Sequence, residues 1–160
     1  MNFFASVEPA PRPQSSQSGH IATALAGVVT TMLVMQLFTF EEFTELATHF
    51  GLPGLDGVIF ASLVIVFELL SLPFLLRMDL SRAFRFVGIV SLVAAMVLWM
   101  YSTVIVVMRS TAESVGFSGG LGTLTPGWWA VAVVAGLWAM SAWAIWGLAP
   151  RRNGLRRTER

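Results

Sequence analysis

The stretch VIFASLVIVFELLSLPFLL, residues 58–76, contains a single charged side chain, Glu68, in an otherwise apolar run. A helix of about 20 residues spans about 30 Å of hydrocarbon at a rise of about 1.5 Å per residue. Three further stretches share this length and character, at residues 21–38, 86–108 and 128–149. They show no period-two alternation, and only helices or closed barrels satisfy every backbone polar group in lipid. The sequence therefore predicts an all-helical membrane protein.

The four runs predict one antiparallel four-helix transmembrane bundle over residues 21–149. With 160 residues, of which 56% are hydrophobic, little of the chain remains for a second domain. The first twenty residues are rich in proline and serine, a composition that predicts a disordered leader. Residues 150–160 form a short tail dominated by arginine.

All ten basic residues are arginines, and nine of them fall on one side of the predicted topology, opposite Arg109. The nine lie in the leader, the turn between spans two and three, and the tail: Arg12, Arg77, Arg82, Arg85, Arg151, Arg152, Arg156, Arg157 and Arg160. Because positive side chains favour the cytoplasmic side of a membrane, we expect both termini in the cytoplasm. An anionic-lipid or nucleic-acid surface is the alternative for the tail. Topology alone accounts for these arginines, so we expect no nucleic-acid partner.

The first loop on the opposite side carries apolar side chains at helical spacing: Phe40, Phe43, Leu46, Ala47 and Phe50. This pattern predicts an amphipathic helix that lies along the non-cytoplasmic surface. Its polar face, a candidate docking surface for a protein partner, contains Glu41, Glu42, Glu45 and His49. Glu45 and His49 are spaced as an i, i+4 pair, but two ligands do not complete a metal site, and we expect no metal.

Glu68 requires an explanation because it lies near the middle of its span. An ionised side chain at that depth costs about 2.5–3.5 kcal/mol on insertion scales. Helix–helix hydrogen bonds in membranes contribute only about 0.6 kcal/mol on average. A purely structural Glu68 is therefore expected to be a neutral acid that bonds between helices. A functional Glu68 carries a proton or orients a ligand, and the sequence leaves both interpretations open.

Counting from the span ends gives the residues expected to be level with Glu68: Thr30, Thr31, Ser91, Met96, Trp138 and Ser141. If these side chains converge, they form with Glu68 a small polar site for a ligand or a proton. Pro73, five residues after Glu68, cannot donate to the carbonyl of Leu69 and is a candidate hinge. Serine and threonine hydroxyls can instead bond their own helix backbone, which is the alternative for those positions.

Several kinds of chemistry are disfavoured by the composition. The chain has no cysteine, which excludes disulfides, cysteine-ligated metal centres and thiol redox chemistry of its own. No nucleophile–base pair and no complete set of metal ligands can be recognised, so a self-contained enzyme with catalytic residues is not expected.

The order of these features resembles the DoxX/MauE family of small four-span membrane proteins. The resemblance covers residues 21–108 and depends on FTELATHFGLP at residues 43–53, the pair Glu68 and Leu69 in the next span, and a short basic turn with Arg82. It implies a four-helix bundle associated with membrane redox complexes, quinone-linked oxidation of sulfur compounds or maturation of periplasmic redox enzymes. It also implies the inner (plasma) membrane of a bacterium.

Three functions follow from these expectations. The favoured one is a non-catalytic membrane subunit of a redox complex that holds a quinone-like or lipid ligand near Glu68. The alternatives are a small proton-coupled transporter component with Pro73 as hinge, and a structural partner that assembles a larger membrane complex.

Overall fold

The computed structural model describes residues 13–50, 54–109 and 127–149, together with positions 7, 9, 10, 114, 116, 117 and 125. In this part of the chain every regular element is a helix: α1 (Ser16–Phe38), α2 (Phe40–Phe50), α3 (Gly57–Leu75), α4 (Arg82–Arg109) and α5 (Trp128–Leu148). Four of them, α1, α3, α4 and α5, are long and apolar enough to cross a membrane. The prediction of an all-helical chain with four apolar spans is confirmed. The predictions for much of the leader (1–6, 8, 11 and 12) and for the tail (150–160) lie outside the described residues.

Helix α1 begins five residues before the predicted span. The amide of Ser18 donates to Oγ of Ser15 at 3.1 Å, and the amide of Ser15 donates to Oγ of Ser18 at 3.2 Å. This reciprocal cap satisfies amides that the first turn of a helix leaves unpaired. The polar residues before the apolar run are therefore helical, which a search for apolar runs does not detect. The other three long helices end within about one turn of their predicted bounds.

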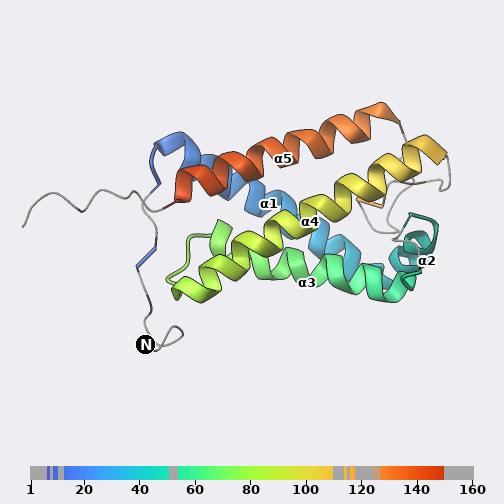
Figure 1. The fold of residues 1–160 in the computed structure, drawn as a ribbon, viewed down its shortest axis with the longest axis horizontal. Helices are drawn as coiled ribbons and strands as arrows, with labels where there is room; N and C mark the ends of the chain where they lie inside the picture. Colours follow the sequence, from blue (N-terminus) through green and yellow to red (C-terminus); the bar gives the residue numbers. More distant parts are fainter. Residues whose placement is uncertain are drawn as a thin grey trace, which may run out of the picture.

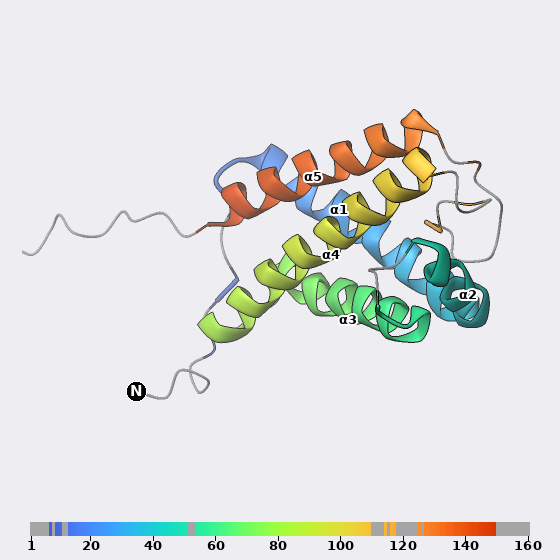
Figure 2. The same cartoon turned by 45° about the vertical axis from the view of Figure 1, so that its right-hand side comes forward.

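The four long helices lie side by side along the longest axis of the molecule, and α2 lies across one end (Figures 1 and 2). Helix α3 packs against α4 and α1, and α5 packs against the same two helices, so the contacts form a closed ring. The core of this ring is apolar and is filled by large side chains such as Phe60, Phe74 and Leu92. It extends to α2 through Phe43 and Ala47, which are completely buried.

A tight turn connects α3 to α4. The amide of Met78 donates to the carbonyl of Pro73 at 3.0 Å and that of Arg77 donates to the carbonyl of Phe74 at 3.1 Å. This is the Schellman pattern of helix termination, and it requires a left-handed residue, here Arg77 with φ of 56°. Ser81 then starts α4 by accepting from the amide of Phe84. Helix α4 thus folds back along α3 after a few residues.

Close backbone approach fixes α2 on the bundle. A Cβ atom at Gly57, the first residue of α3, would contact the carbonyl oxygen of Thr44 and lie 2.8 Å from Cγ2 of Thr48. Only glycine therefore permits α2 to lie so close to the start of α3. This contact holds Phe43 over the interior of the bundle.

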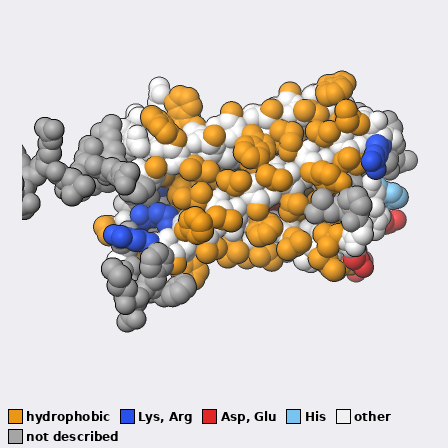
Figure 3. Space-filling model, viewed as in Figure 1, with side chains coloured by type: hydrophobic (Ala, Val, Ile, Leu, Met, Phe, Trp, Pro, Cys, Tyr) orange, Lys and Arg blue, Asp and Glu red, His pale blue; other side chains and the backbone are white. Residues whose placement is uncertain are grey.

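On the face drawn in Figure 3, apolar side chains cover the side of the molecule, and the visible charged groups lie near its two ends. Large residues such as Phe86, Val97 and Val133 are exposed on the long helices. Soluble proteins rarely expose continuous apolar surfaces of this kind. Together with the four long apolar helices, this surface indicates a multi-pass membrane protein whose environment is a lipid bilayer.

The contact between α1 and α5 leads to a stability prediction. A Cβ atom at Gly147 of α5 would overlap the Ser18 side chain and lie 2.8 Å from its Oγ, whereas one at Gly136 meets nothing within 4 Å. We expect Gly147→Ala to lower the free energy of unfolding by about 1–3 kcal/mol because the two helices must separate. Thermal unfolding in mild detergent measures the effect.

Gly136→Ala is the matched control on the same helix, and we expect it to be neutral or slightly stabilising, since alanine favours helix over glycine. Equal midpoints for the two variants would contradict the proposed contact.

Candidate functional site

The carboxyl group of Glu68 lies in the interior of the bundle with no exposed surface. Nε1 of Trp99, on α4, donates a hydrogen bond of 2.7 Å to Oε1 of Glu68. The carbonyl of Glu68 accepts a second bond, of 2.7 Å, from Oγ of Ser71. Glu68 is thus joined to α4 through its side chain and to its own helix through its backbone.

The direction of helical side chains explains why Glu68 meets Trp99. In a helix the Cα–Cβ bond leans toward the N-terminus, so a long side chain covers the preceding turn. The Glu68 carboxyl therefore reaches toward α2, near the start of α3. Helix α4 folds back along α3 (Figure 1). The same lean therefore directs the Trp99 side chain the opposite way, and its indole meets the Glu68 carboxyl.

Several buried polar atoms of α1, α3 and α4 lack a hydrogen-bond partner. The carboxamide of Gln36, on α1, faces the Glu68 carboxyl, but neither of its polar atoms forms a hydrogen bond of good geometry. Oε2 of Glu68 and the hydroxyls of Ser102 and Thr103 are also unpartnered. A buried polar group without a partner costs about 1–3 kcal/mol. Such a concentration of unpartnered atoms marks this region as a candidate functional site.

Aromatic side chains cover the site on the side of α2. The rings of Phe43 and Trp99 stack with centroids 6.1 Å apart, and Phe117 tilts against Trp99 at 5.1 Å. Phe43 is completely buried and Phe117 is half-buried. The indole is therefore held in place on two sides, which fixes the direction of its N–H toward Glu68.

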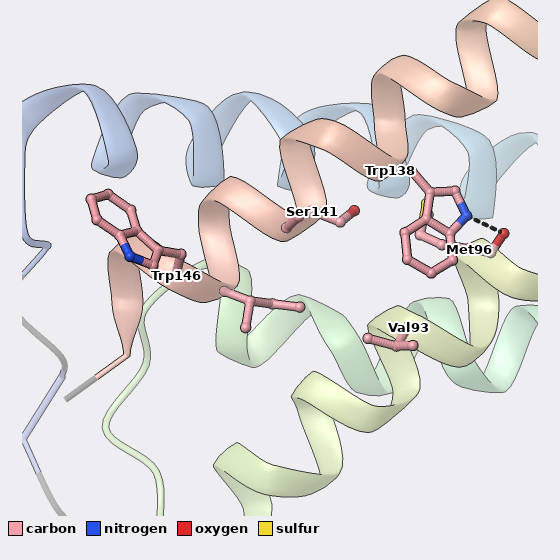
Figure 4. A pocket seen from close by; sticks show the side chains of 7 residues that line it. Val93, Met96, Trp138, Ser141 and Trp146 are labelled. Atoms are coloured by element: carbon pink, nitrogen blue, oxygen red, sulfur yellow. Dashed lines mark hydrogen bonds between the residues drawn. The ribbon is translucent and has the colours of Figure 1, made fainter.

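A second feature is a groove of about 300 Å³ between α4 and α5 (Figure 4). Its lining is Val93, Met96, Trp138, Ser141, Ala142, Ile145 and Trp146. Nε1 of Trp138 donates a 3.0 Å bond to the carbonyl of Met96, which fixes one end of the groove. Its volume lies at the lower end of the range for small-molecule sites.

The structure divides the residues that were expected to surround Glu68. Trp138, Ser141 and Met96 line the groove, and the Ser141 hydroxyl donates to the carbonyl of Leu137 in its own helix. Ser91 is buried in α4, but the hydrogen bond of the Glu68 carboxyl goes to Trp99. The expected convergence of these residues on Glu68 is therefore not observed.

Thr30 and Thr31 were also expected beside Glu68, but both are exposed on α1. The hydroxyl of Thr31 donates to the carbonyl of Gly27, so its own backbone satisfies it. Counting depth from the span ends could not distinguish the inner face of α1 from its outer face. It also ignored the lean of each side chain along its helix.

Pro73 lies inside α3 and is half-buried. It has no N–H, so position 73 provides no backbone donor for the carbonyl of Leu69. Its role as a hinge remains a prediction.

On α2, the polar side chains Glu41, Glu42, Glu45 and His49 are all exposed. They point away from the face that carries the buried Phe43 and Ala47. Within the described residues, no group of three histidine, cysteine, aspartate or glutamate side chains is arranged to hold a metal ion.

Sequence reasoning did not single out Gln36, Trp99, Ser102 or Thr103. The sequence could have indicated Gln36 as a site residue, because it is the one asparagine or glutamine within the four predicted spans. Ser102 and Thr103 lie one turn beyond Trp99 and share its buried face of α4. The sequence could not identify Trp99 as the partner of the Glu68 carboxyl, because this contact depends on how α3 and α4 pack.

The fold and the site together define a multi-pass membrane protein with a carboxyl group buried between its helices. Comparisons of the chain with protein-family models, with curated proteins and with solved structures found no match. The function is therefore inferred from the sequence and from the geometry of the site.

The bond between Trp99 and Glu68 gives a testable contribution to stability. Trp99→Phe keeps an aromatic ring but leaves Oε1 of Glu68 without its donor, and we expect the free energy of unfolding to fall by about 1–3 kcal/mol. Combining it with Glu68→Leu should cost less than the sum of the two single changes, because neither member of this hydrogen bond then leaves a buried partner unpaired. Denaturation in detergent of the unmodified protein, the two single variants and the double variant measures this coupling. If the two effects simply add, the bond does not contribute to stability.

Proposed function

We propose that the chain forms an antiparallel four-helix transmembrane bundle in a bacterial inner membrane, with both termini in the cytoplasm and α2 as an amphipathic helix on the opposite surface. The arginines of the turn between α3 and α4, Arg77, Arg82 and Arg85, support this orientation. The exposed acidic residues of α2 lie at the other end of the bundle and agree with it.

Because the chain has no cysteine, single introduced cysteines test the orientation. Glu45→Cys, on α2, and Met78→Cys, in the turn after α3, replace exposed side chains. In intact spheroplasts we expect a membrane-impermeant maleimide to label Glu45→Cys at once and Met78→Cys only after permeabilisation. The reverse pattern would overturn the proposed orientation.

For the function, we propose a non-catalytic membrane subunit, similar to DoxX, that binds a quinone-like, lipid-soluble molecule within a redox complex. The groove between α4 and α5 is the observation that carries this proposal. It is lined by apolar and aromatic side chains on two membrane-spanning helices, so a ligand would reach it from the hydrocarbon. No residue is assigned to bond making or breaking.

Helix α4 connects this groove with the buried carboxyl. Met96 lines the groove and its carbonyl binds Trp138, while Trp99, three residues further along, donates to Glu68. Residues three apart lie on one face of a helix. A ligand that displaces Met96 or Trp138 therefore acts on the turn of α4 that holds the acid.

The exposed face of α2 supports the association with a protein partner. Glu41, Glu42 and Glu45 present three carboxylates in one turn and a half of helix, away from the buried face. Such a surface favours a partner with a basic patch. Copurification from native membranes in mild detergent identifies that partner.

Filling the groove tests the ligand proposal. Ala142 lines the groove, whereas Ala135 is exposed on the same helix outside it. With decylubiquinone as the probe, we expect saturable binding by the purified protein and a loss of roughly tenfold or more in affinity for Ala142→Trp, since the groove has little spare volume.

Ala135→Trp adds the same indole elsewhere on α5 and should bind the probe like the unmodified protein. Equal affinities for the two tryptophan variants, or binding that never saturates, would exclude the groove as a quinone site.

The buried carboxyl favours a second candidate, a component of a small proton-coupled transporter. Glu68 has no exposed surface and belongs to a helix that contains Pro73. Acidic groups inside membranes often belong to proton or substrate pathways. The two candidates differ in one respect: a transporter must move a solute across the membrane, whereas the subunit only binds its ligand.

A further inference from the structure

Buried polar atoms that lack a hydrogen-bond partner belong to Glu68 and to the two long helices that pack against α3. They are Oε2 of Glu68 on α3, both polar atoms of Gln36 on α1, and the hydroxyls of Ser102 and Thr103 on α4. All four side chains are buried, with at most 1% of their surface exposed. The two α4 residues follow Trp99 by three and four positions, and therefore lie one turn closer to the end of α4 on the face that reaches Glu68.

The chemistry of these atoms defines what can bind there. Nε2 of Gln36 is a donor, Oε1 of Gln36 is an acceptor, and each hydroxyl is both. A bare cation would satisfy the oxygens but would leave the amide donor unpaired. Water both donates and accepts, and buried water typically makes about three hydrogen bonds to such groups.

We propose that Glu68, Gln36, Ser102 and Thr103 form an internal water-binding site through which the Glu68 carboxyl exchanges its proton. In the exchange, the O–H bond at Oε2 breaks, its electron pair stays on that oxygen, and the proton forms a new O–H bond on the adjacent water, which becomes a hydronium ion. Trp99 holds Oε1 and leaves Oε2 as the exchanging atom. The hydronium ion then returns another of its protons to Oε2, which restores the neutral acid with a different proton.

No second buried acid or base competes for this proton within the described residues. Glu68 is the one titratable side chain among the buried polar groups of that part of the chain. On the elements packed against α3, Tyr101 of α4 is half-buried, and Glu41, Glu42, Glu45 and His49 of α2 are exposed. The water-binding residues Gln36, Ser102 and Thr103 carry no charge and serve to hold and orient the water.

Infrared spectroscopy of the full chain reconstituted in lipid tests this proposal. A carboxylic C=O band reports a protonated carboxyl group, and Glu68→Gln identifies the contribution of Glu68 to it. We expect such a band in the unmodified protein and its absence in Glu68→Gln. On transfer to D₂O the band should shift to lower frequency within the time of the measurement. A missing band, or a band that stays unshifted for hours, overturns the proposal.

Variants of the water-binding residues separate this site from a sealed structural acid. We expect Gln36→Leu and Thr103→Val to slow the shift by roughly tenfold, on the scale of one lost hydrogen bond. Thr31→Val is the matched control, because its hydroxyl is exposed on α1 and bonds its own backbone. Thermal unfolding identifies any variant that fails to fold. If Gln36→Leu does not fold, the more conservative Thr103→Val tests the proposal. Unchanged exchange in both site variants, or a band that responds to Na⁺ at constant pH, overturns the assignment.

This inference goes beyond the proposed ligand function and is independent of it. Glu68 does not line the groove between α4 and α5. Unchanged quinone binding in Ala142→Trp therefore overturns the groove proposal alone, whereas unchanged isotope exchange in Gln36→Leu and Thr103→Val overturns the water site alone.

Discussion

In hydrocarbon each backbone N–H and C=O must find its partner within the protein, and this constraint determines most of the structure. It makes the four long segments helical and leaves apolar side chains on their outer faces as well as in the core. Burial from water then cannot drive the helices together, since lipid is as apolar as their side chains. Association depends instead on close contact between backbones and on a few internal hydrogen bonds. Gly147 against Ser18 and Gly57 against Thr44 provide the close contacts.

The internal hydrogen bonds are concentrated on α4. Its carbonyl at Met96 accepts from Trp138 of α5, and its Trp99 indole donates to Glu68 of α3. One helix therefore fixes the position of two neighbours by polar bonds that have no competition from bulk water. It also separates two environments: an apolar groove open to the side of the bundle, and a buried polar region beneath α2.

The ends of the helices show how local chemistry satisfies the groups that the helices leave unpaired. Ser15, Asp56 and Ser81 accept from the first amides of α1, α3 and α4. At the end of α3 a left-handed residue is required, and the chain uses Arg77 where glycine is usual. Arginine at this position adds to the basic charge of the turn at the expense of an unfavourable backbone conformation.

The sequence by itself determined the number of spans, their helical nature and the presence of one acid within them, because length and hydropathy are properties of each segment alone. It also indicated a helix over residues 40–50 from the spacing of apolar side chains. It could not determine which residues meet across the interior. Thr30 and Thr31 were expected beside Glu68 and lie on the outer face of α1, whereas Gln36 and Trp99 reach the acid. All four spans are apolar around their whole circumference, so periodicity does not mark the inner face. Only the packing of the helices, and the lean of side chains along each of them, decided the surroundings of Glu68.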